Sequence, residues 1–159
     1  MKKPDPAISL LVAALDEAFD RRAWHGTNLR GSLRALTAED AVWRPGPGRH
    51  NIWEIMMHAA YWKYAVRRTI TDGKRGSFPY RGSNWFPRSE ADAAGWRRDL
   101  KLLVDEHRQL RATIAAFPVA RLEQPSAKKR YTYAEVIRGI AAHDLYHAGQ
   151  IQLLKRLRK

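Results

Sequence analysis

One apolar stripe constrains the fold of this chain more than any other feature of its sequence. Between residues 96 and 117, large apolar side chains and one histidine recur at alternating spacings of four and three. These residues are Trp96, Leu100, Leu103, His107, Leu110, Ile114 and Phe117. Such spacing places all of them on one face of an α-helix. Because a helix must bury a continuous apolar face, the stripe predicts the seam of a helix bundle.

Capping signals and apolar periodicity divide most of the remaining chain into three further helices. Asn51, followed by an acidic residue three positions later, and Thr132, followed by Glu135, are typical helix starts. The expected helices cover residues 7–24, 51–71 and 89–118, and the last begins after residue 132. No segment shows the alternation of a β-strand. We therefore predict an all-α four-helix bundle, formed as a single domain by residues 1–159.

The connections between these helices contain strong turn signals. Leucines spaced by four and three over residues 29–36 indicate a further helical stretch, and residues 37–40 resemble a short capped turn. Residues 45–48 read Pro-Gly-Pro-Gly and break any helix. Residues 72–88, between the second and third long helices, are rich in Gly, Pro, Ser, Asn and aromatic residues. We expect a long ordered loop there, and loops of such length are often functional.

Composition excludes several classes of protein. The chain has no cysteine, which excludes disulfides, thiolate metal sites and cysteine nucleophiles. No apolar run approaches the ~20 residues of a membrane-spanning helix. Acidic residues near the apolar N-terminal stretch argue against a secretory leader, so we expect a cytoplasmic protein. The 29 Lys and Arg against 16 Asp and Glu give a net charge of +13, which raises the prospect of nucleic-acid binding. The basic residues are scattered, however, and no nucleic-acid-binding motif is present.

The histidines are the most informative polar residues, because four of them fall on the apolar faces of expected helices. His143 and His147 are four apart, so their rings lie one turn from each other on one face. Both can reach one metal ion at about 2.0–2.1 Å, and His58 is the natural third ligand from a facing helix. Three nitrogen ligands leave a position open, as in a catalytic site. The alternative is that these histidines, like His107, are core residues with satisfied nitrogens.

Three strings resemble the DinB-like family of four-helix-bundle proteins. They cover residues 23–26, residues 50–62 and, most specifically, residues 139–155, which contain the sequence His-Asp-Leu-Tyr-His. The resemblance implies a divalent metal held by His58, His143 and His147, with Zn²⁺, Ni²⁺ or Fe²⁺ as candidates. It also implies a homodimer. Known activities in the family depend on thiols, such as transfer of bacillithiol and a mycothiol-dependent isomerisation, and many members have no assigned activity.

Other polar residues are weaker candidates. Glu54, one turn before the first expected ligand, can orient that ligand, act as a base or simply cap its helix. His107 can contact substrate or remain a core residue, and these two are the candidate catalytic residues. His25 can line the mouth of the site or pack locally, and Gln150 can reach its rim.

The sequence thus predicts a metal-dependent transferase or hydrolase that acts on a small molecule. Since the chain has no thiol of its own, a sulfur nucleophile would have to arrive as a low-molecular-weight thiol cosubstrate. A metal with only a stabilising role is a second possibility. The alternative function is a non-enzymatic basic helical bundle that binds nucleic acid or another polyanion.

Overall fold

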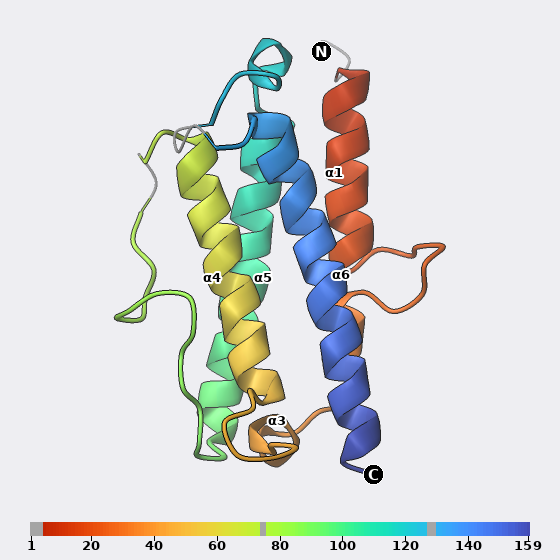
Figure 1. Cartoon of the computed structure of the whole chain (residues 1–159), viewed down its shortest axis with the longest axis vertical. Helices are drawn as coiled ribbons and strands as arrows, with labels where there is room; N and C mark the ends of the chain where they lie inside the picture. The colour runs from red at the N-terminus through yellow and green to blue at the C-terminus, as the bar shows by residue number, and fades with distance from the viewer. Residues whose placement is uncertain (1–4, 74–75, 127–129) are drawn as a thin grey trace.

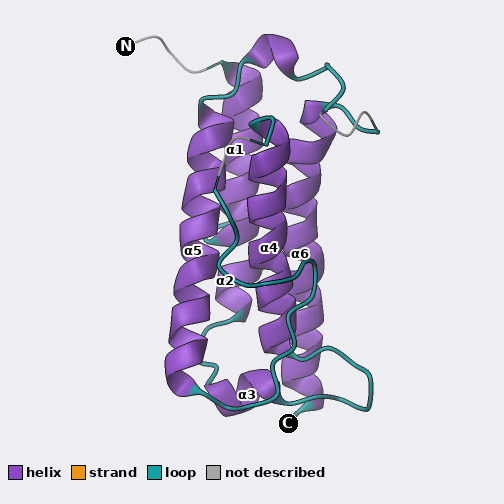
Figure 2. Cartoon of the chain, turned by 90° about the vertical axis from the view of Figure 1, so that its left-hand side faces the viewer, coloured by secondary structure: helices purple, strands orange, loops and turns teal. Residues whose placement is uncertain are grey.

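The structure is a computed structural model that describes residues 5–73, 76–126 and 130–159, and within these residues the chain forms helices and no β-strand. The long helices are α1 (Pro6–Phe19), α4 (Ile52–Ile70), α5 (Ala93–Ala115) and α6 (Tyr133–Leu157). The short ones are α2 (Leu29–Ser32), α3 (Ala38–Val42) and the 3₁₀ helix η1 (Val119–Arg121). The four long helices lie side by side, as in a four-helix bundle, and the all-α prediction is confirmed (Figures 1 and 2).

The predicted helix starts are confirmed in two of three cases. The Asn51 side chain accepts a hydrogen bond from the backbone of Glu54 and begins α4. A capping box between Thr132 and Glu135 begins α6. The third long helix begins after Asp92 and not after Ser89, because it is the Asp92 carboxylate that accepts from a backbone N–H of the first turn.

The first helix is shorter than predicted. It ends at Phe19, the last member of its apolar stripe, whereas the sequence suggested that it continues to Trp24. Beyond Phe19 no apolar side chain continues the buried face, and Trp24 is fully exposed. Gly26, with φ +101°, then turns the chain toward the short helix α2, whose N-cap is Asn28.

The core consists of two apolar clusters, and the predicted stripe contributes side chains to both. On α5 the stripe residues are buried, except for Leu100, which is half-buried. They share these clusters with apolar side chains of the two helices that α5 contacts, α4, such as Met56 and Met57, and α1, such as Leu15 and Phe19. The prediction of a bundle seam is confirmed.

The described parts of the long connection from α4 to α5, residues 71–73 and 76–92, run along the outside of the bundle (Figure 2). The C-terminal part of this connection is fastened to the start of α4. The backbone N–H of Arg88 donates to Glu54, and the backbone carbonyl of Arg88 accepts from the Asn51 side chain at 2.6 Å. The Arg88 side chain also pairs with buried Asp99 on α5. The ordered loop expected over residues 72–88 is therefore present in its described part.

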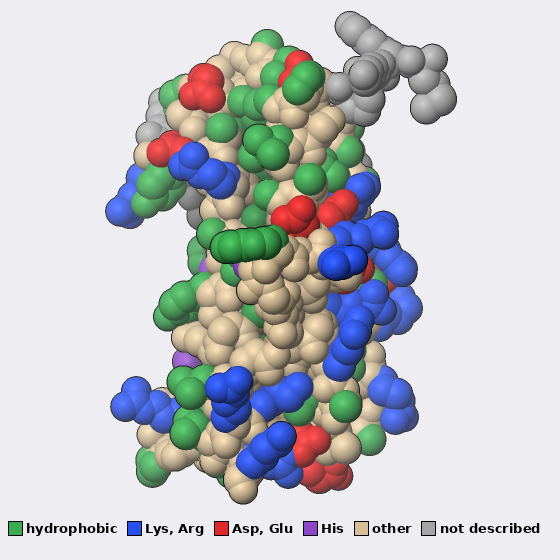
Figure 3. All heavy atoms as spheres, turned by 90° about the vertical axis from the view of Figure 1, so that its right-hand side faces the viewer, with side chains coloured by type: hydrophobic (Ala, Val, Ile, Leu, Met, Phe, Trp, Pro, Cys, Tyr) green, Lys and Arg blue, Asp and Glu red, His purple; other side chains and the backbone are tan. Residues whose placement is uncertain are grey.

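In the chain between α1 and α4, the short helix α3 lies at one end of the bundle (Figure 1). A capping box of Thr37 and Asp40 begins α3, in agreement with the expected capped turn. The Pro-Gly-Pro-Gly segment at residues 45–48 lies in the following loop. No described helix is long and apolar enough to cross a membrane. Figure 3 shows that Lys and Arg side chains on the face of α1 and α6 lie in several separate groups.

Truncation of the seam tests this packing. Leu110 has no exposed surface, so Leu110→Ala is expected to lower the free energy of unfolding by about 2–5 kcal/mol through lost burial and a residual cavity. Leu10 on α1 is 72% exposed, and Leu10→Ala is the control with little expected change. Urea denaturation followed by circular dichroism measures both. Equal effects of the two substitutions would contradict the assignment of the seam.

Candidate metal centre

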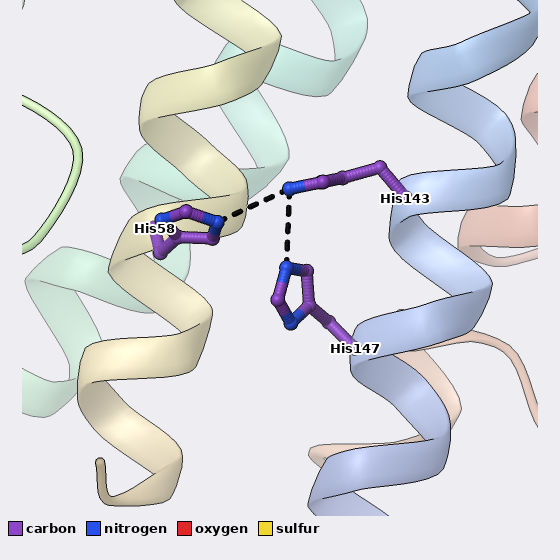
Figure 4. Close-up of side chains that lie close together, drawn as sticks. All are labelled: His58, His143 and His147. Atoms are coloured by element: carbon purple, nitrogen blue, oxygen red, sulfur yellow. Dashed lines mark hydrogen bonds between the residues drawn. The ribbon is translucent and has the colours of Figure 1, made fainter.

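Three histidine side chains point toward one another across the contact between α4 and α6 (Figure 4). His58 comes from α4, and His143 and His147 come from successive turns of α6. The Nε2 atom of His143 lies 3.1 Å from Nε2 of His58 and 3.1 Å from Nε2 of His147. Candidate ligand atoms of all three lie within 4.8 Å of one another. The structure thus brings together the three residues that the sequence proposed as a metal site.

Two of the rings are held in the tautomer that metal binding requires. Nδ1 of His58 lies 2.9 Å from the backbone carbonyl oxygen of Asn84, and a carbonyl can only accept, so this nitrogen carries the proton. Nδ1 of His147 donates in the same way to Oε1 of Gln150 at 2.7 Å. In both rings Nε2 therefore presents its lone pair to the centre of the cluster.

The three rings are neutral near pH 7. Burial is the largest cause, and it lowers the pKa of His58 to about 4 and that of His143 to about 3. Neighbouring imidazoles contribute to both of these values, and burial also lowers the pKa of His147. Neutral imidazoles are the form that binds metals, and the Nε2 lone pairs of His58 and His147 both point at Nε2 of His143, 3.1 Å away. The donor set therefore fits a divalent transition metal.

Two residues of the 71–92 connection build one side of the site. Trp85 stacks on the ring of His58, with centroids 4.0 Å apart, and on its other face stacks on His50 at 3.6 Å. Asn84 bonds His58 through its carbonyl, and its side chain accepts from Nε1 of Trp62 at 2.9 Å. Asn84 has φ +67°, a left-handed conformation that asparagine tolerates. The sequence indicated a functional aromatic loop, but nothing in it singled out Asn84 or Trp85.

Glu54 fastens this loop and does not join the histidine cluster. Its buried carboxylate accepts from the side chains of Arg44 and His50 and from the backbone N–H of Arg88. Burial alone would raise the pKa of Glu54, but these donors together lower it to about 2. The carboxylate is therefore ionised and already engaged. We assign to Glu54 the positioning of the loop segment that carries Trp85.

Of the other candidates, His107 and His25 lie apart from the three clustered histidines, and Gln150 contacts one of them. His107 is buried against Phe19, with ring centroids 3.7 Å apart, and the structure does not bring it into the histidine cluster. Burial, followed by the nearby Lys63 ammonium, lowers the pKa of His107 to about 3. His25 is exposed in the loop between α1 and α2. Gln150 reaches the site, as the sequence suggested, by bonding His147.

A cavity of about 640 Å³ opens onto the histidines. All three line it, together with Gln150 and His50. The apolar part of its wall consists of Pro45, Ile55, Trp85, Tyr146, Leu153 and Leu154. Arg49 contributes the one permanent charge among the described residues that line the cavity, and none of them is acidic. The cavity therefore suits a small organic molecule with an apolar body and a negative charge.

The hydrogen bond to His147 offers a test of the ring orientation. Gln150→Ala removes the acceptor for Nδ1, so we expect the affinity for a divalent metal to fall by about tenfold. Gln152→Ala, a matched control on the same helix but outside the cavity, is expected to leave the affinity unchanged. Competition with a chromogenic chelator measures both affinities. An unchanged affinity for Gln150→Ala would show that this bond does not orient the ligand.

Comparison with known proteins identifies the family of the chain. No curated protein and no solved structure matches the sequence. The model of the DinB superfamily, however, matches residues 7–151, which include His58, His143 and His147. This match covers most of the chain and agrees with its helical fold. The chain belongs to the DinB superfamily.

Proposed function

We propose that the protein binds one divalent transition metal ion through Nε2 of His58, His143 and His147. The observation that carries this proposal is the convergence of the three Nε2 atoms, with the Nδ1 atoms of His58 and His147 held by Asn84 and Gln150. Zn²⁺, Ni²⁺ and Fe²⁺ all suit imidazole ligands. When bound, such an ion acts as a Lewis acid and lowers the pKa of a coordinated thiol or water.

We further propose that the site is catalytic, in a metal-dependent transferase or hydrolase. Three protein ligands leave room for a further ligand, and the adjoining cavity is large enough for a small molecule. Trp85 shields one face of His58 from water, and the apolar wall desolvates what enters. The chain contains no cysteine, so a low-molecular-weight thiol would supply the nucleophile in a thiol transfer. In a hydrolysis, water would fill that role.

Arg49 supports a preference for anionic molecules. It is exposed at the cavity, and no ion pair of its guanidinium appears among the contacts of the described residues. The net charge of +13 also attracts anions toward the molecule from a distance. We propose that Arg49 binds the negative group of the substrate or cosubstrate. The apolar part of that molecule would lie against Trp85 and Leu154.

Metal content tests the first proposal. Protein purified without a histidine tag and then loaded with Zn²⁺ is expected to hold about one equivalent, by mass spectrometry of the metals. His143→Ala removes the central nitrogen of the cluster and is expected to lose that equivalent. His25→Ala, which changes an exposed histidine, is the control and is expected to retain it. Equal metal content in the two variants would contradict the ligand assignment.

Two matched thiols test the preference for anions. The metal-loaded protein is expected to bind 3-mercaptopropionate more tightly than 3-mercaptopropanol, by about 1 kcal/mol, because only the former can pair with Arg49. Arg49→Gln is expected to remove this difference. Arg156→Gln makes the same change of charge at an exposed position outside the cavity and should preserve it. Calorimetric titration measures the affinities, and equal preferences in the two variants would contradict the role of Arg49.

A further inference from the structure

A line of polar side chains crosses the core next to the metal site, and all four long helices contribute to it. Asp144 on α6 accepts a hydrogen bond from Nζ of Lys63 on α4. This Nζ lies 3.5 Å from Nδ1 of His107 on α5, whose Nε2 lies 3.9 Å from a carboxylate oxygen of Asp16 on α1. Arg111 on α5 pairs with Asp16 at 2.7 Å and ends the line at the surface. We call these five residues the polar layer.

The centre of the polar layer is an ion pair with no access to water. The side chains of Lys63 and Asp144 are both 0% exposed. Removing two charges from water is costly, and an apolar pair of similar volume is often as stable or more stable. Stability is therefore a weak explanation for this pair. The pair has a stronger effect on other packings of the helices, because any packing that separates the two residues leaves two unpaired buried charges.

The alternatives that this pair excludes would disrupt the histidine cluster. Asp144 follows His143 directly on α6, and Lys63 lies on α4, the helix that carries His58. A shift of α4 along α6 by one helical turn, about 5.4 Å, would preserve contact between apolar faces. The same shift would carry His58 away from His143, because their Nε2 atoms now lie 3.1 Å apart.

We infer that Lys63 and Asp144 are positioning residues that fix the register of α4 against α6 and thereby assemble the three-histidine metal site. The inference rests on the proposed metal binding. Neither residue belongs to the ligand set, and the ion pair acts through the backbones of the two helices. His107 on α5 contacts Lys63 and so belongs to the polar layer. We therefore assign His107 a structural role in this layer and no contact with substrate.

A second buried ion pair provides a matched control. Arg67 lies one turn after Lys63 on α4 and pairs with Glu106 at 3.0 Å, and both side chains are at most 7% exposed. This pair joins α4 to α5, whereas the pair of Lys63 and Asp144 joins α4 to α6. Removing it changes the same number of buried charges without touching the contact that carries the histidines.

The test compares two double variants that replace each ion pair by apolar residues. Lys63→Met with Asp144→Val is expected to fold and to lose about tenfold or more in affinity for Co²⁺, with a changed visible absorption spectrum of the bound ion. Arg67→Met with Glu106→Leu is expected to keep the spectrum and an affinity within about twofold of the wild type. If the first double variant does not fold, Lys63→Met with Asp144→Asn, which retains the volume at residue 144 and leaves no buried charge, is measured in its place with the same expected direction.

A readout without metal separates this inference from the metal proposal. The rings of His58 and His143 have centroids 5.0 Å apart, so we expect a nuclear Overhauser effect between their ring protons in wild-type protein from which metal has been removed. The first double variant should lose it and the control should retain it. A wild type that binds no Co²⁺ but shows this pattern would refute only the metal site. A folded variant at Lys63 and Asp144 with wild-type affinity, spectrum and Overhauser effect would overturn the positioning role.

Discussion

The contact between α4 and α6 is the interaction on which the candidate site depends. The two helices run in opposite directions (Figure 1), so the early turns of α4 face the later turns of α6. One helix supplies His58 and the other supplies two histidines one turn apart. The three imidazole nitrogens meet only where these two helices lie against each other. The register of α4 against α6 therefore decides whether the three histidines come together.

The loop from α4 to α5 adds a second level of control. None of its described residues joins the histidine cluster, but Asn84 fixes the tautomer of His58 and Trp85 covers its ring. Glu54 and Arg44 in turn fasten the end of this loop to the first turn of α4. A carboxylate one turn before a ligand thus serves the site from a distance. Surrounding bonds of this kind orient metal ligands in many proteins.

Much of the fold and of the histidine cluster could be predicted from the sequence, because both depend on helical periodicity. The α5 stripe predicted the seam, and the spacing of His143 and His147 predicted that their rings share a face. Periodicity carries no information about contacts between residues that are far apart in the sequence. Asn84 reaches His58 through a backbone carbonyl, which any residue possesses, so its identity carried no signal.

Charged residues within apolar stripes were the other limit of sequence reasoning. Lysine is almost never fully buried without a partner, and the partner of Lys63 is Asp144, 81 residues away. The predicted start of the third long helix differed from the observed start of α5 for a related reason. Asp92 and Ser89 are both good caps, and only the backbone geometry decides that Asp92 begins α5. Local preference thus restricts the candidates, and tertiary contacts select among them.

Anomalous X-ray diffraction from metal-loaded crystals, collected at the absorption edge of the bound ion, tests the central claim most directly. The three-histidine account predicts one strong peak between α4 and α6, about 2.0–2.1 Å from Nε2 of each of His58, His143 and His147. A loaded crystal without a peak at this position, or with its ion bound by other residues, would contradict the account.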